Sequence, residues 1–186
     1  MFPCAGRGGT YTGGAAGGRG CYDGAMPLTI RPALAADREA LIEQYLGLNR
    51  YEEPIAGNRV LDHAGAVESL ADAEERLARN NGTALVAELD GRVVGHLFLE
   101  FREHPVFVRA ALRPYAYVAE LFVREEARGG GVGTALMREA ERIAAARGVG
   151  RLMVEVLAGN AMAEAFYARR GFKAHAIELG KAIGRG

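Results

Sequence analysis

Cysteine is nearly absent from this chain, and long apolar runs are absent altogether. The two thiols, Cys4 and Cys21, both precede Met26, so the sequence that follows cannot contain a disulfide framework. Repeated glycines interrupt the N-terminal region, which therefore lacks the apolar core of a signal peptide. No apolar run approaches the roughly 18 residues that a transmembrane helix needs. These absences predict a cytoplasmic protein with no membrane partner.

The chain also lacks an excess of charge. Lysine plus arginine and aspartate plus glutamate each number 23, which gives a formal net charge of zero at pH 7. A general nucleic-acid-binding surface normally needs a basic excess, so nucleic acid is not an expected partner. No metal site is expected either, because the histidines are scattered and lack partner ligands. These histidines are His63, His96, His104 and His175.

Glycine is concentrated in residues 1–25, and apolar side chains are few there. Such a segment loses much conformational entropy on ordering and gains little burial in return, so it is predicted to be a disordered leader. Met26 is a candidate for the natural start. The remaining residues, 26–186, are long enough to form a single domain with its own core.

Hydrophobic periodicity and turn residues predict the order strand, helix, helix, three strands, helix, strand, helix, strand. In the first half, the expected elements are a strand at Leu28–Arg31, a helix capped by Asp37 and ended by Gly47 and Asn49, a loop over Tyr51–Gly65, and a helix begun by Ser69 and Asp72 and ended by Asn80–Gly82. In the second half, they are a loop over Arg102–Pro114, a strand at Tyr115–Val123, a helix before Gly148, a strand at Arg151–Leu157, a helix at Ala161–Arg170 and a strand at Phe172–Leu179.

Two connections predict the type of sheet. Thr83–Leu89 and Arg92–Phe101 are joined by Asp90-Gly91, a strong hairpin signal, which indicates antiparallel pairing. The strand–helix–strand unit from Tyr115 to Leu157 needs a right-handed crossover, which makes its two strands parallel. The fold class is therefore α/β, with a mixed sheet and helices on its faces.

A glycine-rich turn, Arg128-Gly-Gly-Gly-Val-Gly-Thr134, lies between a predicted strand and a predicted helix. Helix N-termini attract anions, and glycine lets a diphosphate approach the main chain closely. No lysine follows the glycines, which excludes a Walker A loop, and the third glycine of a dinucleotide fingerprint is missing. The remaining pattern is Arg-x-x-Gly-x-Gly. The alternatives are an ordinary flexible turn and a nucleotide-binding protein.

With the downstream pattern Asn160-x-x-Ala-x-x-Phe-Tyr167 and Arg170-Gly-Phe172, the turn resembles the GNAT N-acetyltransferase superfamily. The resemblance extends over roughly Leu28–Leu179. It implies a mixed sheet in which a splayed strand pair forms a slot for acyl-CoA. It also implies an enzyme that transfers acetyl from acetyl-CoA directly to a primary amine in a ternary complex. The alternative is a catalytically silent acyl-CoA-binding or regulatory module on the same fold.

The resemblance assigns site residues. Tyr167 occupies the general-acid position, although a tyrosine at helical spacing is more often part of a core, and Asn160 would contact the cofactor or cap its helix. The neighbouring Phe166 is expected to be a core residue. The expected cofactor-binding residues are Leu121, Phe122, Val123, Arg128, Gly129, Gly130, Gly131, Val132, Gly133, Thr134 and Asn160.

Glu120 is the candidate general base. Its neighbours Val118, Leu121 and Phe122 are apolar, and a carboxyl in such surroundings has a raised pKa, which suits a base acting near neutral pH. The alternatives are a solvated strand residue and a substrate-binding anion. An acetyl-cysteine route is not expected, because both thiols lie in the leader.

The acceptor amine is expected to contact Tyr45–Gly65 and the loop Arg102–Pro114. Acidic side chains in the first segment would suit a cationic amine, although such clusters are usually just solvated. These acidic residues are Glu52, Glu53 and Asp62. The acceptor can be a small-molecule amine or a peptide amine. The sequence also leaves open whether the protein forms a homodimer.

Overall fold

A computed structural model describes residues 28–183 of the 186-residue chain. The predicted leader, residues 1–25, lies outside the described residues. The chain forms two compact units, the first ending at Glu155 and the second beginning at Val156. The first unit contains β1 (Thr29–Pro32), η1 (Ala35–Asp37), α1 (Arg38–Ala56), α2 (His63–Arg79), β2 (Thr83–Leu89), β3 (Arg92–Glu103), η2 (Ala110–Leu112), β4 (Pro114–Val123), η3 (Glu125–Ala127), α3 (Val132–Ala146) and β5 (Leu152–Val154); the second contains α4 (Ala161–Ala168).

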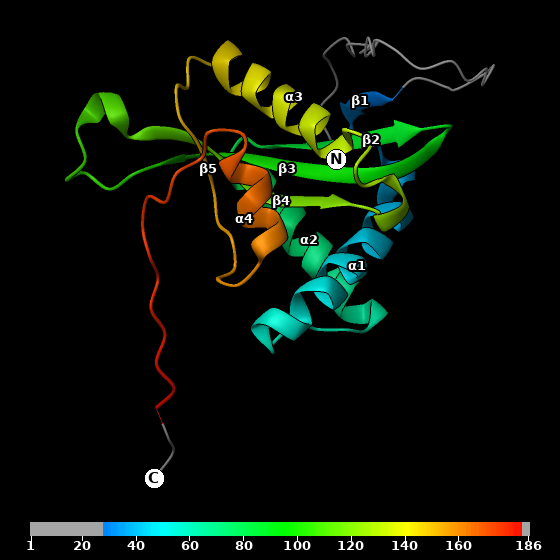
Figure 1. The fold of residues 1–186 in the computed structure, drawn as a ribbon. Coiled ribbons are helices and arrows are strands. Elements are labelled where there is room, and N and C mark those ends of the chain that lie inside the picture. Colours follow the sequence, from blue (N-terminus) through cyan, green and yellow to red (C-terminus); the bar gives the residue numbers. More distant parts are fainter. Residues whose placement is uncertain (1–27, 184–186) are drawn as a thin grey trace. The chain divides into compact units, whose positions relative to one another are not determined.

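The five strands form one sheet in the order β1-β2-β3-β4-β5. The first three pairs are antiparallel, and β4 pairs with β5 in parallel, as the crossover through α3 predicts. In the first unit, α3 lies over one face of the sheet, while α1 and α2 lie over the other (Figure 1). The predicted α/β fold with a mixed sheet is confirmed.

The β2–β3 hairpin turns at Asp90 and Gly91, as predicted. Their φ angles are 51° and 72°, which is the left-handed pair that a type I′ turn requires. The ladder continues from this turn as far as Thr83 opposite Leu99, with a bulge beside Ala87. The antiparallel pairing of β2 with β3 therefore follows from a local turn signal in the sequence.

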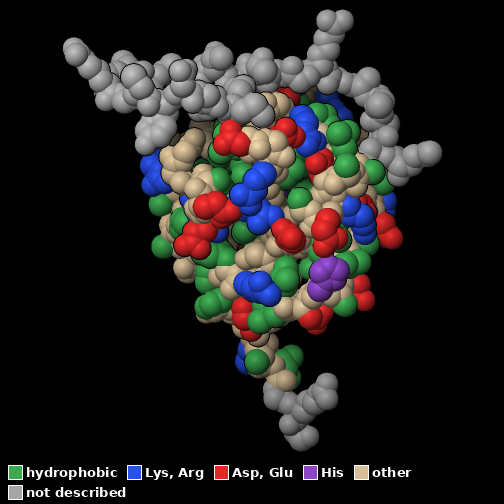
Figure 2. Space-filling model, turned by 90° about the vertical axis from the view of Figure 1, so that its right-hand side faces the viewer, with side chains coloured by type: hydrophobic (Ala, Val, Ile, Leu, Met, Phe, Trp, Pro, Cys, Tyr) green, Lys and Arg blue, Asp and Glu red, His purple; other side chains and the backbone are tan. Residues whose placement is uncertain are grey.

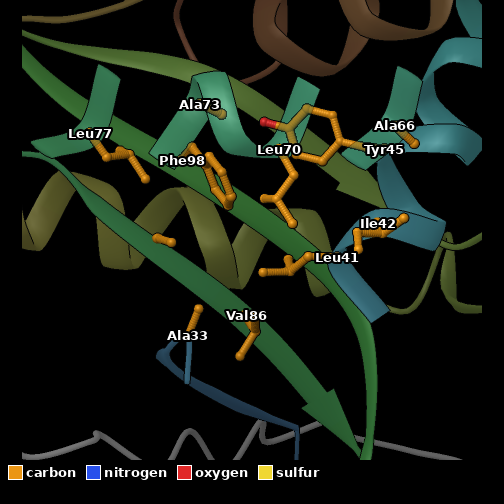
Figure 3. Close-up of a cluster of buried hydrophobic side chains, with 11 residues drawn as sticks. Ala33, Leu41, Ile42, Tyr45, Ala66, Leu70, Ala73, Leu77, Val86 and Phe98 are labelled. Carbon is orange, nitrogen blue, oxygen red and sulfur yellow. The ribbon is translucent and has the colours of Figure 1, made fainter. Parts of the chain in front are cut away.

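The larger part of the core lies between the sheet and α1 with α2 (Figure 3). Leu41, Leu70 and Phe98 in this core are at most 2% exposed, and Tyr45 is 3% exposed. Because every second side chain of a strand points to the same face, the other face of the sheet needs its own cover. There α3 buries the apolar stripe Val132, Leu136, Met137, Ala140 and Ala144.

The prediction that Gly47 and Asn49 end the first helix is wrong, because α1 continues to Ala56. Gly47 serves close packing, since a Cβ there would lie 2.9 Å from Cζ of the buried Phe122. The side chain of Asn49 donates to the Val60 carbonyl at 2.9 Å. The helix ends at Gly57, whose φ of 66° is left-handed.

The predicted loop over Tyr51–Gly65 and the cap at Ser69 are also wrong. Only residues 57–62 separate α1 from α2, and Asp62 caps α2 by accepting a hydrogen bond from Gly65 N at 2.8 Å. Ser69 lies inside the helix, where its hydroxyl donates to the Gly65 carbonyl at 2.7 Å. A serine that hydrogen-bonds back along its own helix leaves the same sequence pattern as a capping serine.

The strand predicted at Arg151–Leu157 is shorter than expected, because β5 covers only Leu152–Val154. The strand predicted at Phe172–Leu179 does not form, and residues 172–183 have no regular structure. A strand is stable only when a neighbour satisfies its main chain, and the described part of the second unit contains no other strand. Ile177 and Leu179 are accordingly more than 80% exposed.

Gly82 is a position where a side chain would disrupt packing. A Cβ there would lie 2.5 Å from Cδ2 of Leu77 and 2.6 Å from the Leu99 carbonyl oxygen. We expect Gly82→Ala to lower the free energy of unfolding by about 2 kcal/mol in urea titrations, because strand backbone cannot easily move aside. Gly150→Ala is the control: no atom lies within 4 Å of its Cβ, so it should change stability by less than about 0.5 kcal/mol. Equal effects of the two substitutions would refute this account of Gly82.

Acidic and basic side chains are interspersed on the face that Figure 2 shows, in keeping with the zero net charge. Within residues 28–183, no helix is long and apolar enough to cross a membrane.

Candidate active site

The second half of β4 is paired on one side only. β3 pairs with β4 along its length, up to Gly95 opposite Val123. β5 pairs with β4 only from Ala116 to Val118. No described strand of the first unit therefore lines the β5 side of residues 119–123, which is the arrangement expected of a splayed strand pair. We call this side the open edge of β4.

Main-chain donors point to the open edge. Arg124 N donates to the Val94 carbonyl of β3 at 2.8 Å. Because successive N–H groups of a strand point to opposite sides, those of Val123 and Leu121 point away from β3. An extended ligand with amide groups could pair there as an added strand would.

A β-bulge in β4 determines where Glu120 points. Phe98 pairs with Glu120 and Leu99 pairs with Val118, so Ala119 is an extra residue without a partner. Ala119 packs against the core below α1 and α2, and Glu120 also contacts α2. Two consecutive residues thus point to the same face of the sheet, which simple alternation would forbid.

The Glu120 side chain lies in a mostly buried, charged environment. It is 19% exposed, and its Oε1 lies 3.3 Å from Nη2 of Arg76. Burial, chiefly, raises the pKa of Glu120 to about 7; Arg76 opposes this effect, and the nearby carboxylate of Glu52 adds to it. A carboxyl with this pKa can accept and release a proton near neutral pH.

The glycine turn presents its main chain to open space. Gly129 and Gly131 have φ angles of 80° and 85°, and no atom lies within 4 Å of the position of a Cβ at either residue. Gly131 is the N-cap of α3, whose first helical hydrogen bond is donated by Ala135 N to the Gly131 carbonyl. The N–H groups of Val132 and Gly133 precede that bond, so they have no partner in the helical ladder. The turn can therefore hold an anion with main-chain donors.

Comparison with known proteins agrees with this geometry. The family model described as "Acetyltransferase (GNAT) family" matches residues 48–172, which is more than half of the chain. The chain belongs to the GNAT acetyltransferase family.

Solved structures also resemble the chain. A GCN5-related N-acetyltransferase from Ralstonia eutropha is 26% identical, with a TM-score of 0.65; 84% of this chain and 98% of that chain are covered. A Trypanosoma brucei acetyltransferase (19% identity, TM-score 0.60) and a transcriptional regulator from Bacillus halodurans (23% identity, TM-score 0.65) are each covered over 99% of their length and 84% of this chain. The last two similarities support the GNAT fold alone.

In this GNAT protein, the side chain of Arg128 folds back onto the end of β4. Its Nε donates to the Val123 carbonyl at 3.0 Å, and its guanidinium carbon lies 5.4 Å from the ring centre of Tyr51. The main chain of Arg128 belongs to the glycine turn, while Thr134 lies half-buried in the first turn of α3. Because its side chain is engaged in these contacts, the main chain of Arg128 is better placed than its guanidinium to make the predicted phosphate contact.

The second unit contains the other predicted site residues. Asn160 is buried and caps α4, since its Oδ1 accepts a hydrogen bond from Ala163 N at 3.1 Å. Tyr167 is 8% exposed, and its ring packs edge-on against Phe166 and Phe172. The capping role of Asn160 is therefore seen, while its cofactor contact and the acid role of Tyr167 stay predictions.

The prediction that Phe166 is a core residue is wrong. Phe166 is only half-buried, and the guanidinium of Arg170 covers its ring at 3.5 Å. Tyr167, one position along, takes the buried place instead. In a helix as short as α4, the apolar pattern does not decide which of two adjacent aromatic residues faces inward.

Arg76 and Tyr45 are neighbours of Glu120 that no sequence motif reveals. Tyr45 is buried. Its hydroxyl lies near enough to Glu120 to lower the pKa of that carboxyl, although the two groups do not meet the geometry of a hydrogen bond. The signal that could have revealed Arg76 is Glu100, a carboxylate within the apolar run of β3. A buried carboxylate needs a cationic or hydrogen-bonding partner.

The acidic residues expected to attract the acceptor are engaged within the chain. Glu52 pairs with Nε of Arg59 at 2.7 Å, and the Glu53 carboxylate accepts a hydrogen bond from Arg59 N at 2.6 Å. Asp62 caps α2. These contacts favour a structural role for the segment. In residues 28–183, no group of three or more His, Cys, Asp or Glu side chains could hold a metal ion.

Proposed function

We propose that this GNAT protein is an acetyl-CoA-dependent N-acetyltransferase that transfers acetyl directly to a primary amine in a ternary complex. One observation carries the proposal: β4 presents a carboxyl with a pKa near 7, then an open edge, and then leads into a turn suited to a diphosphate. One continuous stretch of chain thus offers a base for the amine, an open strand edge for the amide-bearing arm of the cofactor, and a turn for its diphosphate.

The main chain would perform most of the binding. The turn Arg128–Thr134 would hold the diphosphate with N–H groups at the N-terminus of α3. Leu121 and Val123 would pair with the amides of the pantetheine arm, and the Phe122 side chain anchors the strand in the core between them. Empty space beside Gly129 and Gly131 leaves room for the phosphate oxygens.

The transfer step has a consistent proton balance. Glu120 would take a proton from the attacking ammonium, directly or through a water, because a free amine has a pKa of about 10.4 and is mostly charged at neutral pH. A C–N bond then forms while the C–S bond of the thioester breaks. The N–H of Leu121 would stabilise negative charge on the thioester oxygen, and Tyr167 would give a proton to the departing thiolate. The nitrogen loses a second proton as the amide forms, and this proton, carried by solvent water, would restore the Tyr167 hydroxyl.

The proposal is tested by two-substrate kinetics. Thiol release from acetyl-CoA is measured against a panel of primary amines, and initial rates are recorded at several concentrations of both substrates. Direct transfer predicts double-reciprocal lines that intersect, and parallel lines would instead indicate an acetylated enzyme. Tyr167→Phe should lower kcat by about tenfold to a hundredfold without weakening acetyl-CoA binding, because phenylalanine cannot give a proton to the thiolate.

The rival is a GNAT module that binds acyl-CoA without turning it over. Glu120 and Tyr167 both favour the enzyme, since a binding module needs neither a base nor an acid. Tight CoA binding with no thiol release on any amine of the panel would establish the rival.

A further inference from the structure

Two polar residues of α2, Asp72 and Arg76, and the C-cap that follows them, Asn80, are spaced at intervals of four. Residues four apart lie above one another on a helix. The adjoining stripe, Leu70, Ala73 and Leu77, is buried in the core. The polar stripe therefore follows the border of the core, above the strands that carry Glu100 and Glu120.

Arg76 joins three carboxylates. Its Nη1 contacts Asp72 within α2, its Nε lies 3.4 Å from Oε1 of Glu100 in β3, and its Nη2 lies 3.3 Å from Oε1 of Glu120 in β4. The planar guanidinium spans the two strands in a way that a point charge could not. The position of the Glu120 carboxylate is thereby tied to that of Glu100.

Glu100 is itself firmly held. Its carboxylate is 1% exposed and accepts hydrogen bonds from Asn80 Nδ2 at 2.8 Å and from Arg102 Nε at 2.7 Å. The guanidinium of Arg102 in turn lies 3.8 Å from the ring centre of Tyr117. Because Glu100 has several donors, its carboxylate is fixed in position and gives Arg76 a rigid anchor.

We propose that Arg76 is a positioning residue for the transfer reaction: anchored by Glu100, it holds the Glu120 carboxylate at the bulge and favours its charged form. This inference rests on the proposed function, in which Glu120 is the base. Arg76 itself does not touch the reacting atoms in this scheme; it acts through Glu120.

The groups of the first unit that act on Glu120 are few. From α1 they are Tyr45 and Glu52, from α2 Arg76, and from β3 Glu100. Burial and the two carboxylates raise the pKa of Glu120, whereas Arg76 and, to a smaller extent, the Tyr45 hydroxyl lower it. Among these four residues only Arg76 is cationic, so its removal leaves the negative charges unopposed.

The first test is the pH profile of kcat/KM in Arg76→Met. Loss of an opposite charge at this distance should move the acidic limb up by about one pH unit. The variant should therefore be about tenfold less active below pH 7 and nearly normal at pH 9. Arg76→Lys restores the charge and should return the limb most of the way to the wild-type position. Arg76→Gln is a second neutral variant in case the methionine variant folds poorly.

Arg38→Met is the matched control. Arg38 joins α1 to α2 through Glu74 at 2.8 Å, so its removal costs one cross-helix ion pair without touching the Glu120 cluster. A purely structural role for Arg76 predicts that Arg76→Met, like Arg38→Met, loses thermal stability with an unmoved acidic limb. That outcome would overturn the proposal.

A second readout does not depend on turnover. The protein labelled with 13C at the glutamate carboxyl carbons is titrated by NMR, and the Glu120 signal is assigned by its loss in Glu120→Gln. We expect the Glu120 midpoint to rise by about one pH unit in Arg76→Met and to stay unchanged in Arg38→Met. If no amine is acetylated but this shift occurs, the proposed function fails while the control of Glu120 by Arg76 stands. An unmoved midpoint would overturn the inference whatever the activity.

Discussion

Glu120→Gln should lower kcat on the best amine by about 100-fold to 1,000-fold at pH 7.5, with little change in the affinity for acetyl-CoA. Glutamine has the same shape and retains a hydrogen bond to Arg76, but it cannot accept the proton of the ammonium. The expected loss is that of a positioned general base. Thiol release measures kcat, and calorimetry with CoA measures the affinity.

The pH profile makes the same prediction more specific. Since the pKa of Glu120 is about 7 and the base acts in its deprotonated form, wild-type kcat/KM should rise as the pH increases through about 7. In Glu120→Gln this acidic limb should disappear. If the variant keeps both the rate and the limb, Glu120 is not the base, and its environment at the bulge serves only the fold.

Gly131→Val should weaken CoA binding by at least about 30-fold. The φ angle of 85° is left-handed, and a β-branched residue adopts it only with strain. The added side chain would also fill the space beside the N-terminus of α3 that we assign to the diphosphate. Calorimetric titration with CoA gives the dissociation constant directly.

Gly148→Val separates strain from ligand contact. Gly148 lies just beyond the other end of α3, with a φ of 72° and no atom within 4 Å of the position of its Cβ. Both substitutions should therefore lower stability to a similar extent, but Gly148→Val should bind CoA as the wild type does. Equal losses of CoA affinity in the two variants would show that the glycine turn has no special part in binding.

Local signals account for the elements that the sequence predicted well. The Asp90-Gly91 turn predicted the β2–β3 hairpin. The apolar stripe of α3 predicted the crossover helix that makes β4 and β5 parallel. The errors occur where a tertiary contact decides. Gly47 is a helix breaker by propensity, yet it lies within α1 because the Phe122 ring packs against it. No local pattern could have shown that contact.

The candidate site divides in the same way. The glycine turn and Glu120 lie close together in the sequence, so their chemistry could be inferred from it. The positions of Arg76 and Tyr45 could not, because α2 and α1 meet β4 only after the chain has folded. The bulge at Ala119, which directs Glu120 to the same face as Arg76, also has no signature in the residues themselves.

We propose that acetyl-CoA lies along the open edge of β4 and over the glycine turn. This proposal is tested most directly by the amide NMR spectrum of 15N-labelled protein titrated with CoA. We expect the largest chemical-shift changes at the amides of Leu121, Val123 and Gly129–Gly133. The amides of β1 and β2, toward the opposite edge of the sheet, should change little. Saturation by CoA that leaves the amides of β4 and the turn unshifted would contradict the account.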